Sequence, residues 1–191
     1  LSRGLGDVYK RQGQGFDTVG SVDQSNGLFT LCKANDSTLC AQTANQISFV
    51  LGDPNDIPLS GKWTSSFTHF GPGVFRPSNG LIYLRNNLTT GFADYTMVLG
   101  IPGDIGLAGD WNGDGLDSPG VYRPSTQNFY LNDQVCNCSE FATYTFQYGN
   151  PGDYPVTGDW IGQGHDGIGL FRQSNGFTYL RNSLTTGFAD I

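Results

Sequence analysis

Apolar residues in this chain come in short runs that are rich in aromatic and β-branched side chains. The runs are bounded by Gly, Pro, Asn and Asp, as at residues 81–85 and 143–148. Such runs between turn-forming residues predict β-strands rather than helices. The tetrapeptide Pro-Ser-Asn-Gly at residues 77–80 places Pro where a turn needs a fixed φ and Gly where φ becomes positive. The pattern predicts an all-β protein built from hairpins.

The strand candidates recur with a regular period. Trp63, Trp111 and Trp160 stand 48 and 49 residues apart. Residues 84–94 return almost unchanged at 180–190. A fixed period of about 40–50 residues is typical of solenoids, propellers and other arrays of repeats.

Each repeat offers four short strand candidates. In the second repeat they are residues 57–63, 73–76, 81–85 and 95–100. Four antiparallel strands in about 48 residues is the size of one β-propeller blade, which favours propeller-type blades over a β-solenoid or a row of small sandwiches. The predicted blades are residues 13–56, 57–104, 105–153 and 154–191, with the first and last incomplete.

The repeats also predict where the core lies and what the ends do. A blade buries its faces by stacking on its neighbours, so Trp63, Trp111 and Trp160 are expected to be core anchors, with stacking on a ligand as the alternative. Residues 1–12 fit no repeat and resemble translated linker or adapter sequence, so we expect them to lie outside a single repeat domain at 13–191. We expect this domain to be a fragment of a larger propeller that self-associates through unclosed blade edges.

Charge and composition exclude several partners. The formal net charge is −7, and 16 of the 17 acidic residues are Asp, Glu140 being the exception. This acidic balance argues against nucleic acid and anionic membranes. No apolar run approaches the roughly 20 residues that a membrane-spanning helix needs, so no membrane insertion is expected.

The four cysteines occupy one position of the repeat. A Cys32–Cys40 bridge would close a short hairpin loop, whereas Cys136 and Cys138 are separated by a single residue, which is tight for a disulfide. A link between the two loops and a zinc site are the alternatives, although no His stands near either pair. Secreted disulfides are the favoured interpretation.

One loop carries a pattern of candidate metal-binding residues. Residues 110–117 alternate oxygen-bearing side chains with other residues, and Gly stands where the loop must turn sharply. Ca²⁺ takes six to eight oxygen ligands in proteins, so this spacing predicts a calcium-binding hairpin loop, with a turn that holds no metal as the alternative. The predicted ligands are Asp110, Asn112, Asp114, the carbonyl of Leu116, and Asp117.

A family resemblance follows from these motifs. Gly-Asp-Trp-Asn-Gly-Asp-Gly-x-Asp, then Gly-Val-Tyr-Arg-Pro, then Tyr-Leu-x-Asn, resembles the FG-GAP/VCBS-type calcium-binding repeats across residues 13–191. In that family such repeats form blades of seven-bladed propellers, in integrin α-chain heads and in secreted bacterial proteins. The resemblance implies Ca²⁺ as cofactor, held by the residues named above.

The other repeats depart from the full motif. In the fourth, Asp159, Gln163 and Asp166 remain while Ile161 replaces the Asn, which predicts a weaker metal site. In the second, Lys62 replaces the first Asp, and we expect no site there or in the first repeat.

Functional alternatives remain at this point. The chain has no nucleophile elbow, zinc-protease motif or phosphate-binding Gly loop, and its two His, His69 and His165, are expected to be loop residues. The favoured hypothesis is a non-catalytic, calcium-stabilised binding, adhesion or scaffold module, extracellular or at the cell surface, that engages a protein or glycan through rim loops. The alternatives are a propeller domain of, or accessory to, a secreted carbohydrate-active enzyme, and a structural array without ligand.

Overall fold

The computed structural model confirms the all-β class. It describes residues 8–9, 18–33, 37–67, 69–139 and 141–191. In these residues the strands form four small sheets, and the only helical segments are the single turns α1 (Ser37–Cys40) and η1 (Thr43–Asn45). In the described part of the chain, no helix has the length and apolar character that crossing a bilayer requires.

Each sheet is made almost entirely of strands that follow one another in sequence. Sheet one contains β1 (Val8–Tyr9), β2 (Thr18–Asp23), β3 (Leu28–Cys32) and β4 (Gln46–Val50). Sheet two contains β5 (Ile57–Gly61), β6 (Gly71–Arg76), β7 (Leu81–Leu84) and β8 (Tyr95–Val98). Sheet three contains β9 (Ile105–Gly109), β10 (Ser118–Arg123), β11 (Asn128–Leu131) and β13 (Tyr144–Gln147). Sheet four contains β14 (Asp153–Gly158), β15 (Gly167–Arg172) and β16 (Phe177–Arg181).

Neighbouring strands within these sheets are antiparallel, as short hairpins require. One added strand, β12 (Cys138–Ser139), comes from the sheet-three loop and pairs in parallel with β8 at the edge of sheet two. Strand β1 pairs with β2, although Val8 and Tyr9 belong to the stretch expected outside the fold. The rest of that stretch lies outside the described residues.

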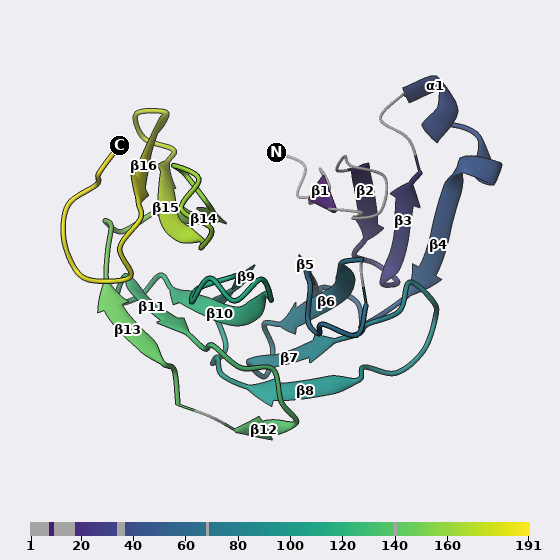
Figure 1. Cartoon of the computed structure of the whole chain (residues 1–191), viewed down its shortest axis with the longest axis horizontal. Coiled ribbons are helices and arrows are strands. Elements are labelled where there is room, and N and C mark those ends of the chain that lie inside the picture. Colours follow the sequence, from purple (N-terminus) through teal and green to yellow (C-terminus); the bar gives the residue numbers. More distant parts are fainter. Residues whose placement is uncertain (1–7, 10–17, 34–36, 68, 140) are drawn as a thin grey trace.

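The sheets follow one another along an open arc (Figure 1). Their first strands, such as β5, β9 and β14, lie on the concave side, and β4, β8 and β13 lie on the convex side. No closed ring of sheets is present in the described residues. The regular sheets and their stacking set the positions of every loop considered below.

The hairpin turn between the second and third strands repeats with one exception. Gly80 has φ of 75°, and its N–H donates to the carbonyl of Arg76 (2.8 Å). Gly27 and Gly176 take the same left-handed conformation, for which Gly has no steric penalty. In the third repeat Gln127 occupies this position with φ of 55°. The predicted turn therefore forms even where its Gly is absent.

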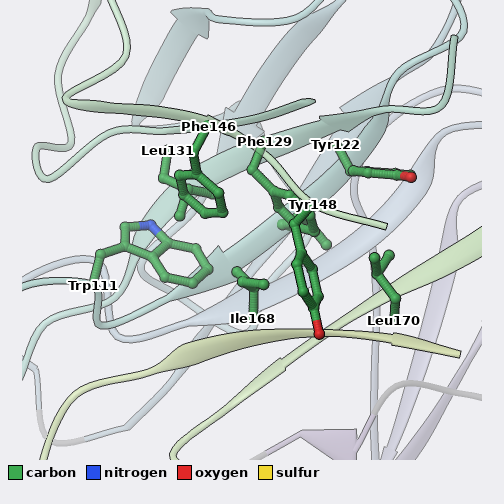
Figure 2. Packing of buried hydrophobic residues seen from close by; sticks show 9 residues of the cluster. Trp111, Tyr122, Phe129, Leu131, Phe146, Tyr148, Ile168 and Leu170 are labelled. Carbon is green, nitrogen blue, oxygen red and sulfur yellow. The ribbon is translucent and has the colours of Figure 1, made fainter. Parts of the chain in front are cut away.

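The sheets pack on one another through apolar clusters between successive sheets. Phe75 of sheet two is fully buried and lies directly against the backbone of Gly106 in sheet three, where a side chain would collide with the ring. Figure 2 shows the next interface, in which Ile168 and Leu170 of β15 lie opposite the aromatic face of sheet three. Burial of these large side chains is the main favourable term holding adjacent sheets together.

The three tryptophans stand at the ends of the first strands. Trp63 and Trp111 are 4% and 3% exposed, whereas Trp160 is only partly buried. The Nε1–H of Trp63 donates to the carbonyl of Pro72 (3.2 Å), and that of Trp160 donates to Ile168 (3.1 Å). Each of these two indoles thus ties the first strand of its sheet to the second.

A buried ion pair that the sequence analysis missed recurs in sheets two, three and four. A buried Asp just before or at the start of the first strand accepts hydrogen bonds from both Nε and Nη2 of an Arg at the end of the second strand. The Arg Nη2 to Asp Oδ2 distances are 2.8, 2.9 and 2.8 Å. The guanidinium also lies over a Tyr ring of the third strand, 4.6, 4.4 and 4.3 Å from its centroid. The three units are Asp56–Arg76–Tyr83, Asp104–Arg123–Tyr130 and Asp153–Arg172–Tyr179.

Candidate metal centre

The predicted calcium loop connects β9 to β10 at one end of sheet three, and it is organised around the Asp110 carboxylate. Oδ1 of Asp110 accepts from the N–H of Gly113 (2.8 Å) and of Asp114 (3.1 Å). Oδ2 accepts from Gly115 N–H (2.8 Å). These bonds fold the loop back on its first residue, in the manner of Asx turns.

Asn112 and Asp114 extend this network. Oδ1 of Asn112 accepts from the N–H of Asp114 (3.0 Å), and its amide nitrogen donates to Asp114 Oδ2 (3.2 Å). Asp114 Oδ1 accepts from Leu116 N–H (2.8 Å). The loop therefore brings Asp110, Asn112 and Asp114 together through shared hydrogen bonds.

Asp117 forms hydrogen bonds to the loop of the neighbouring sheet. Its Oδ2 accepts from Lys62 N–H (2.6 Å), and its own N–H donates to the Lys62 carbonyl (3.0 Å). Asp166 repeats this arrangement one sheet further on: its Oδ2 accepts from Asp110 N–H (2.9 Å), and its N–H donates to the Asp110 carbonyl (2.6 Å). The last Asp of each loop thus links that loop to the corresponding loop of the preceding sheet.

A cavity of about 290 Å³ lies beside the loop. Asp114 and Asp117 line it, together with Trp63 and with Asp133 from the segment after β11. Oδ1 of Asp133 is buried and has no hydrogen-bond partner among the described residues. Burial raises the pKa of the Asp133 carboxyl, and the charges of Asp114 and Asp110 add to the rise while a Tyr144 hydrogen bond opposes it.

Asp133 is a site residue that sequence reasoning missed. It follows the third strand, about 20 residues away from the loop motif, so no local spacing pointed to it. The only signal is the change from Asn86 and Asn182 at the corresponding positions of other repeats to a carboxylate in the repeat with the full motif.

The predicted weaker site in sheet four is a loop of the same length with fewer side-chain hydrogen bonds. Asp159 Oδ1 accepts from Gln163 N–H (2.9 Å) and Oδ2 from Gly164 N–H (2.8 Å). The hydrogen bonds from Gly164 and Gln163 lower the pKa of the Asp159 carboxyl. Asp166 is bonded to the preceding loop, so the fourth repeat keeps Asp159 as the organising carboxylate of its loop.

In the described part of the chain, no group of three or more His, Cys, Asp or Glu side chains is placed to hold a metal ion. Of the two His, His165 lies in the sheet-four loop close to Gly113 of the preceding loop. His69 stacks at a tilt on Phe67, with ring centroids 5.2 Å apart.

The cysteines lie in two pairs at disulfide distance. Cys32 pairs with Cys40 across the segment that contains α1, with 5.3 Å between their Cα atoms. Cys136 pairs with Cys138, whose Cα atoms are 5.4 Å apart, and the structure shows no link between the two loops. The Cys32–Cys40 pairing agrees with the sequence prediction, and the tight Cys136–Cys138 pair was the less expected of the two.

A second candidate site is a set of loops on the convex side of the arc, which we call the Phe loops. They follow β7, β11 and β16 and carry Phe92, Phe141 and Phe188, which are 95%, 97% and 92% exposed. All three Phe residues precede an Ala at the same position of the repeat. Sequence analysis treated this stretch only as part of the repeat.

Hydrogen bonds hold the Phe loops in place. Arg85 Nε donates to the Thr89 carbonyl (2.8 Å), Nη2 donates to Thr89 Oγ1 (2.9 Å), and Nη1 donates to the Phe92 carbonyl. Arg181 makes the same contacts in the loop after β16. Thr90 Oγ1 accepts from Val50 N–H (3.0 Å) of the preceding sheet. The loops after β7 and β16 are therefore tied both to their own sheet and to the one before it.

The comparisons with known proteins leave the family open. No model of a known protein family matches the chain, and no curated protein matches it significantly. The functional argument accordingly depends on the sequence and geometry of this chain.

Proposed function

We propose that this chain is a non-catalytic, calcium-stabilised binding or adhesion module of the FG-GAP/VCBS propeller type, which engages a glycan or protein through its Phe loops. The observation that carries the proposal is the set of almost fully exposed Phe rings at one repeat position. An extracellular or cell-surface location is compatible with two cysteine pairs at disulfide distance.

The exposed rings favour binding over a purely structural array. An exposed Phe gains nothing for folding, and its apolar area promotes unwanted association. Yet Phe-Ala persists in the third repeat, where the surrounding loop has changed to a Cys-Asn-Cys-Ser sequence. Aromatic side chains are the usual anchors of binding interfaces. Phe92 and Phe188 lie on loops that Arg85 and Arg181 hold by hydrogen bonds, and groups already held in place lose less entropy on binding.

The strand-start carboxylates favour a non-catalytic role. A propeller enzyme would place an Asp or Glu at the strand start of only one or two blades. Here the buried Asp recurs in sheets two, three and four, and each is paired with an Arg. Repetition and neutralisation by Arg are typical of structural ion pairs, and they provide no unpaired acid or base at these positions.

Calcium is proposed to rigidify the loop at Asp110. The donor set fits a hard cation, because carboxylate and amide oxygens are the ligands that Ca²⁺ prefers. Asp110, Asn112 and Asp114 already lie together. Oδ2 of Asp110 and both carboxylate oxygens of Asp114 each accept one hydrogen bond, which leaves each of them a second lone pair for a cation. Asp133 adds a carboxylate oxygen without a partner beside the same loop. When bound, Ca²⁺ would supply the positive charge that offsets this cluster.

The proposed binding role is tested by replacing all three rings, Phe92→Ser, Phe141→Ser and Phe188→Ser. The triple variant and the parent are compared on a glycan array and in surface-protein capture, with calcium and with EDTA. We expect at least about a hundredfold loss of binding with little change in Tm, because each of the three aromatic anchors contributes about 1–2 kcal/mol.

The matched control replaces two exposed apolar residues outside the Phe loops, Tyr154→Ser and Phe177→Ser, which are 49% and 64% exposed. This control is expected to bind like the parent. Equal binding by the parent and the triple variant would contradict the role of the Phe loops. Turnover of chromogenic glycosides by the parent would instead favour an enzyme.

A further inference from the structure

The loops after β7, β11 and β16 are each attached to the fourth strand of the preceding sheet by one side-chain oxygen. In the loops after β7 and β16 this oxygen belongs to a Thr hydroxyl, which accepts from a backbone N–H of β4 and of β13. In the loop after β11 it is Oδ1 of Asn137, which accepts from Thr96 N–H of β8 (2.8 Å). The attachment is thus the same in the three loops, although the residue that makes it differs.

The means of holding each loop in shape alternates along the chain. In each sheet a Leu of the third strand pairs with a Gly of the second, and the residue after this Leu is Arg85 in sheet two and Arg181 in sheet four. Each Arg bonds to its own loop four and seven residues further on. The corresponding residues are Cys32 in sheet one and Asn132 in sheet three. All four cysteines belong to the two segments that lack the Arg, so a disulfide pair stands wherever the Arg is missing.

Asn132 does not hold its loop as the Arg does. Its buried side chain accepts from Gln134 N–H, only two residues further on (3.0 Å), and residues 132–143 contain neither Arg nor Lys. The Cys136–Cys138 pair closes this loop instead, with 5.4 Å between the two Cα atoms. The resulting ring encloses only Asn137, so it restricts the backbone of the residue that binds β8.

The ring lies on sheet two. Nδ2 of Asn137 donates to the Asp94 carbonyl (3.2 Å), while Oδ1 accepts from Thr96. Cys138 and Ser139 form β12, which pairs with β8. Both cysteines of the ring also pack against the apolar cluster of sheet two. The contacts that join this loop to sheet two are therefore made by the ring itself and by the residue after it.

We infer that the Cys136–Cys138 disulfide is a thiol-sensitive latch, which holds the loop after β11 on sheet two when oxidised and releases it when reduced. A dithiol is the reductant. Its thiolate attacks one sulfur, which breaks the disulfide, forms a mixed disulfide and leaves the other cysteine to take up a proton. The second thiol of the reductant then displaces the remaining cysteine as a thiol, and the reductant departs as a cyclic disulfide.

Opening the ring releases the loop because the attachment is small. The backbone around Asn137 regains its conformational freedom when the ring opens. Two hydrogen bonds at the edge of a sheet contribute little, because water replaces them when they break. The open loop therefore spends much of its time away from β8.

The latch is accessible to thiols. Cys136 and Cys138 are both partly exposed, whereas Cys32 of the other pair is only 6% exposed. Exposed disulfides exchange with thiols more readily than buried ones. The loops that Arg85 and Arg181 hold contain no cysteine, so thiols leave their attachments unchanged. Among the three attachments, only that of the loop after β11 is thiol-sensitive.

One consequence of the latch rests on the proposed function. Phe141 follows Cys138 by three residues, so release of the loop weakens binding through this Phe loop alone. Phe92 and Phe188 stay on loops that Arg side chains hold.

Amide hydrogen exchange resolved to single residues tests the latch in the parent protein, oxidised and after treatment with dithiothreitol. Thr96 N–H is bonded to Asn137 of the ring. Gln147 N–H makes the matching bond to Thr186, in the loop that Arg181 holds, and is the internal control. We expect reduction to make Thr96 exchange at least about tenfold faster and to leave Gln147 within about twofold, because only the first attachment opens.

Two double variants separate the latch from the other disulfide. Cys136→Ser with Cys138→Ser should show fast Thr96 exchange without dithiothreitol and no further change when it is added. The matched control, Cys32→Ser with Cys40→Ser, should keep slow Thr96 exchange until dithiothreitol is added.

Three results would overturn the inference. One is unchanged Thr96 exchange after alkylation shows that Cys136 and Cys138 are reduced. Another is a rise at Gln147 equal to that at Thr96, because reduction would then loosen the whole molecule. The third is a pair that stays oxidised in dithiothreitol until the protein unfolds. Exchange is measured without ligand, so the latch and the proposed ligand binding can fail separately.

Discussion

At the scale of single residues, the Asp–Arg–Tyr units explain how buried carboxylates are tolerated. Each side chain of Asp56, Asp104 and Asp153 is at most 4% exposed, and isolated carboxylates so placed would be strongly destabilising. The Arg supplies two charge-assisted hydrogen bonds, and its flat face lies on the Tyr ring. In sheet four the hydrogen bond from Arg172 lowers the pKa of Asp153, against the opposing effect of burial.

This pair predicts acid sensitivity. The folded pKa of Asp153 lies below its ordinary 3.8, so its stabilising contribution is complete above pH 3.8 and is lost as pH falls below that value. Asp153→Asn should cost about 3 kcal/mol at pH 7 and should flatten the fall in stability below the ordinary Asp pKa of 3.8. Urea unfolding at several pH values measures both effects.

The matched control is Asp53→Asn, because Asp53 pairs with Arg76 at 2.8 Å but is 66% exposed. We expect it to cost less than about 1 kcal/mol, as exposed ion pairs do. An Asp153→Asn variant with the same acid dependence as the parent would show that the pair does not control acid unfolding.

At the scale of elements, the β9–β10 loop forms a candidate metal centre with its first residues and a contact to the preceding sheet with its last residue. The first six residues of the β9–β10 loop, 110–115, fold around the Asp110 carboxylate. The last, Asp117, instead exchanges two hydrogen bonds with the preceding loop at Lys62. A single loop therefore combines a candidate metal centre with a contact between sheets.

Two substitutions separate these purposes. Asp117→Ala should lower stability by about 1–2 kcal/mol in calcium and in chelator alike, because it leaves the part-buried N–H of Lys62 without its charged acceptor. Asp114→Ala should lower Tm only when calcium is present, because its hydrogen bonds within the exposed loop contribute little. Thermal unfolding in calcium and in EDTA measures both.

For each of the two variants, one result of the unfolding experiment would contradict the role proposed for that Asp. A loss for Asp114→Ala that is as large in EDTA as in calcium would contradict a metal role. An Asp117→Ala variant with the parent's Tm in EDTA would contradict the contact between sheets.

At the scale of the whole molecule, the stability of each sheet depends on the apolar contacts it makes with the adjacent sheets. Sheets two and three each bury one face on the sheet before them and one on the sheet after them, as in other stacked repeats. Sheet four has the first contact, through Ile168 and Leu170, but its Trp160 face is partly exposed. It should therefore open more easily than sheet three.

Amide hydrogen exchange tests whether sheet four opens more easily than sheet three. Strands β10 and β15 are both central strands with paired neighbours on either side, so they differ mainly in what covers their faces. We expect β15 amides to exchange faster than β10 amides, because local opening of sheet four exposes less buried apolar surface. Equal protection in the two strands would argue against a coverage effect.

Much of the fold was readable from the repeat. The period, the Gly, Pro, Asn and Asp punctuation and the aromatic runs predicted the strands and hairpins, because these depend on local backbone preferences. The candidate loop at Asp110 was found for the same reason, since most of its hydrogen bonds lie within six residues.

Other features could not be predicted from local sequence patterns, because they depend on contacts between residues far apart in the sequence. The Asp–Arg–Tyr units join residues about 20 positions apart, and Asp133 meets the candidate loop only after the chain has crossed two strands. The partner of Asp117 is 55 residues away in sequence, so its position in the motif suggested a ligand and not a link between sheets.

The sequence by itself determined that this protein is a run of short antiparallel strands with turns at fixed intervals, because turn chemistry and side-chain branching act within a few residues. The tertiary structure decided which faces are covered, which carboxylates are paired, and which phenylalanines stay in water. Those outcomes depend on how one sheet packs against the next, and packing depends on residues that lie a whole repeat apart.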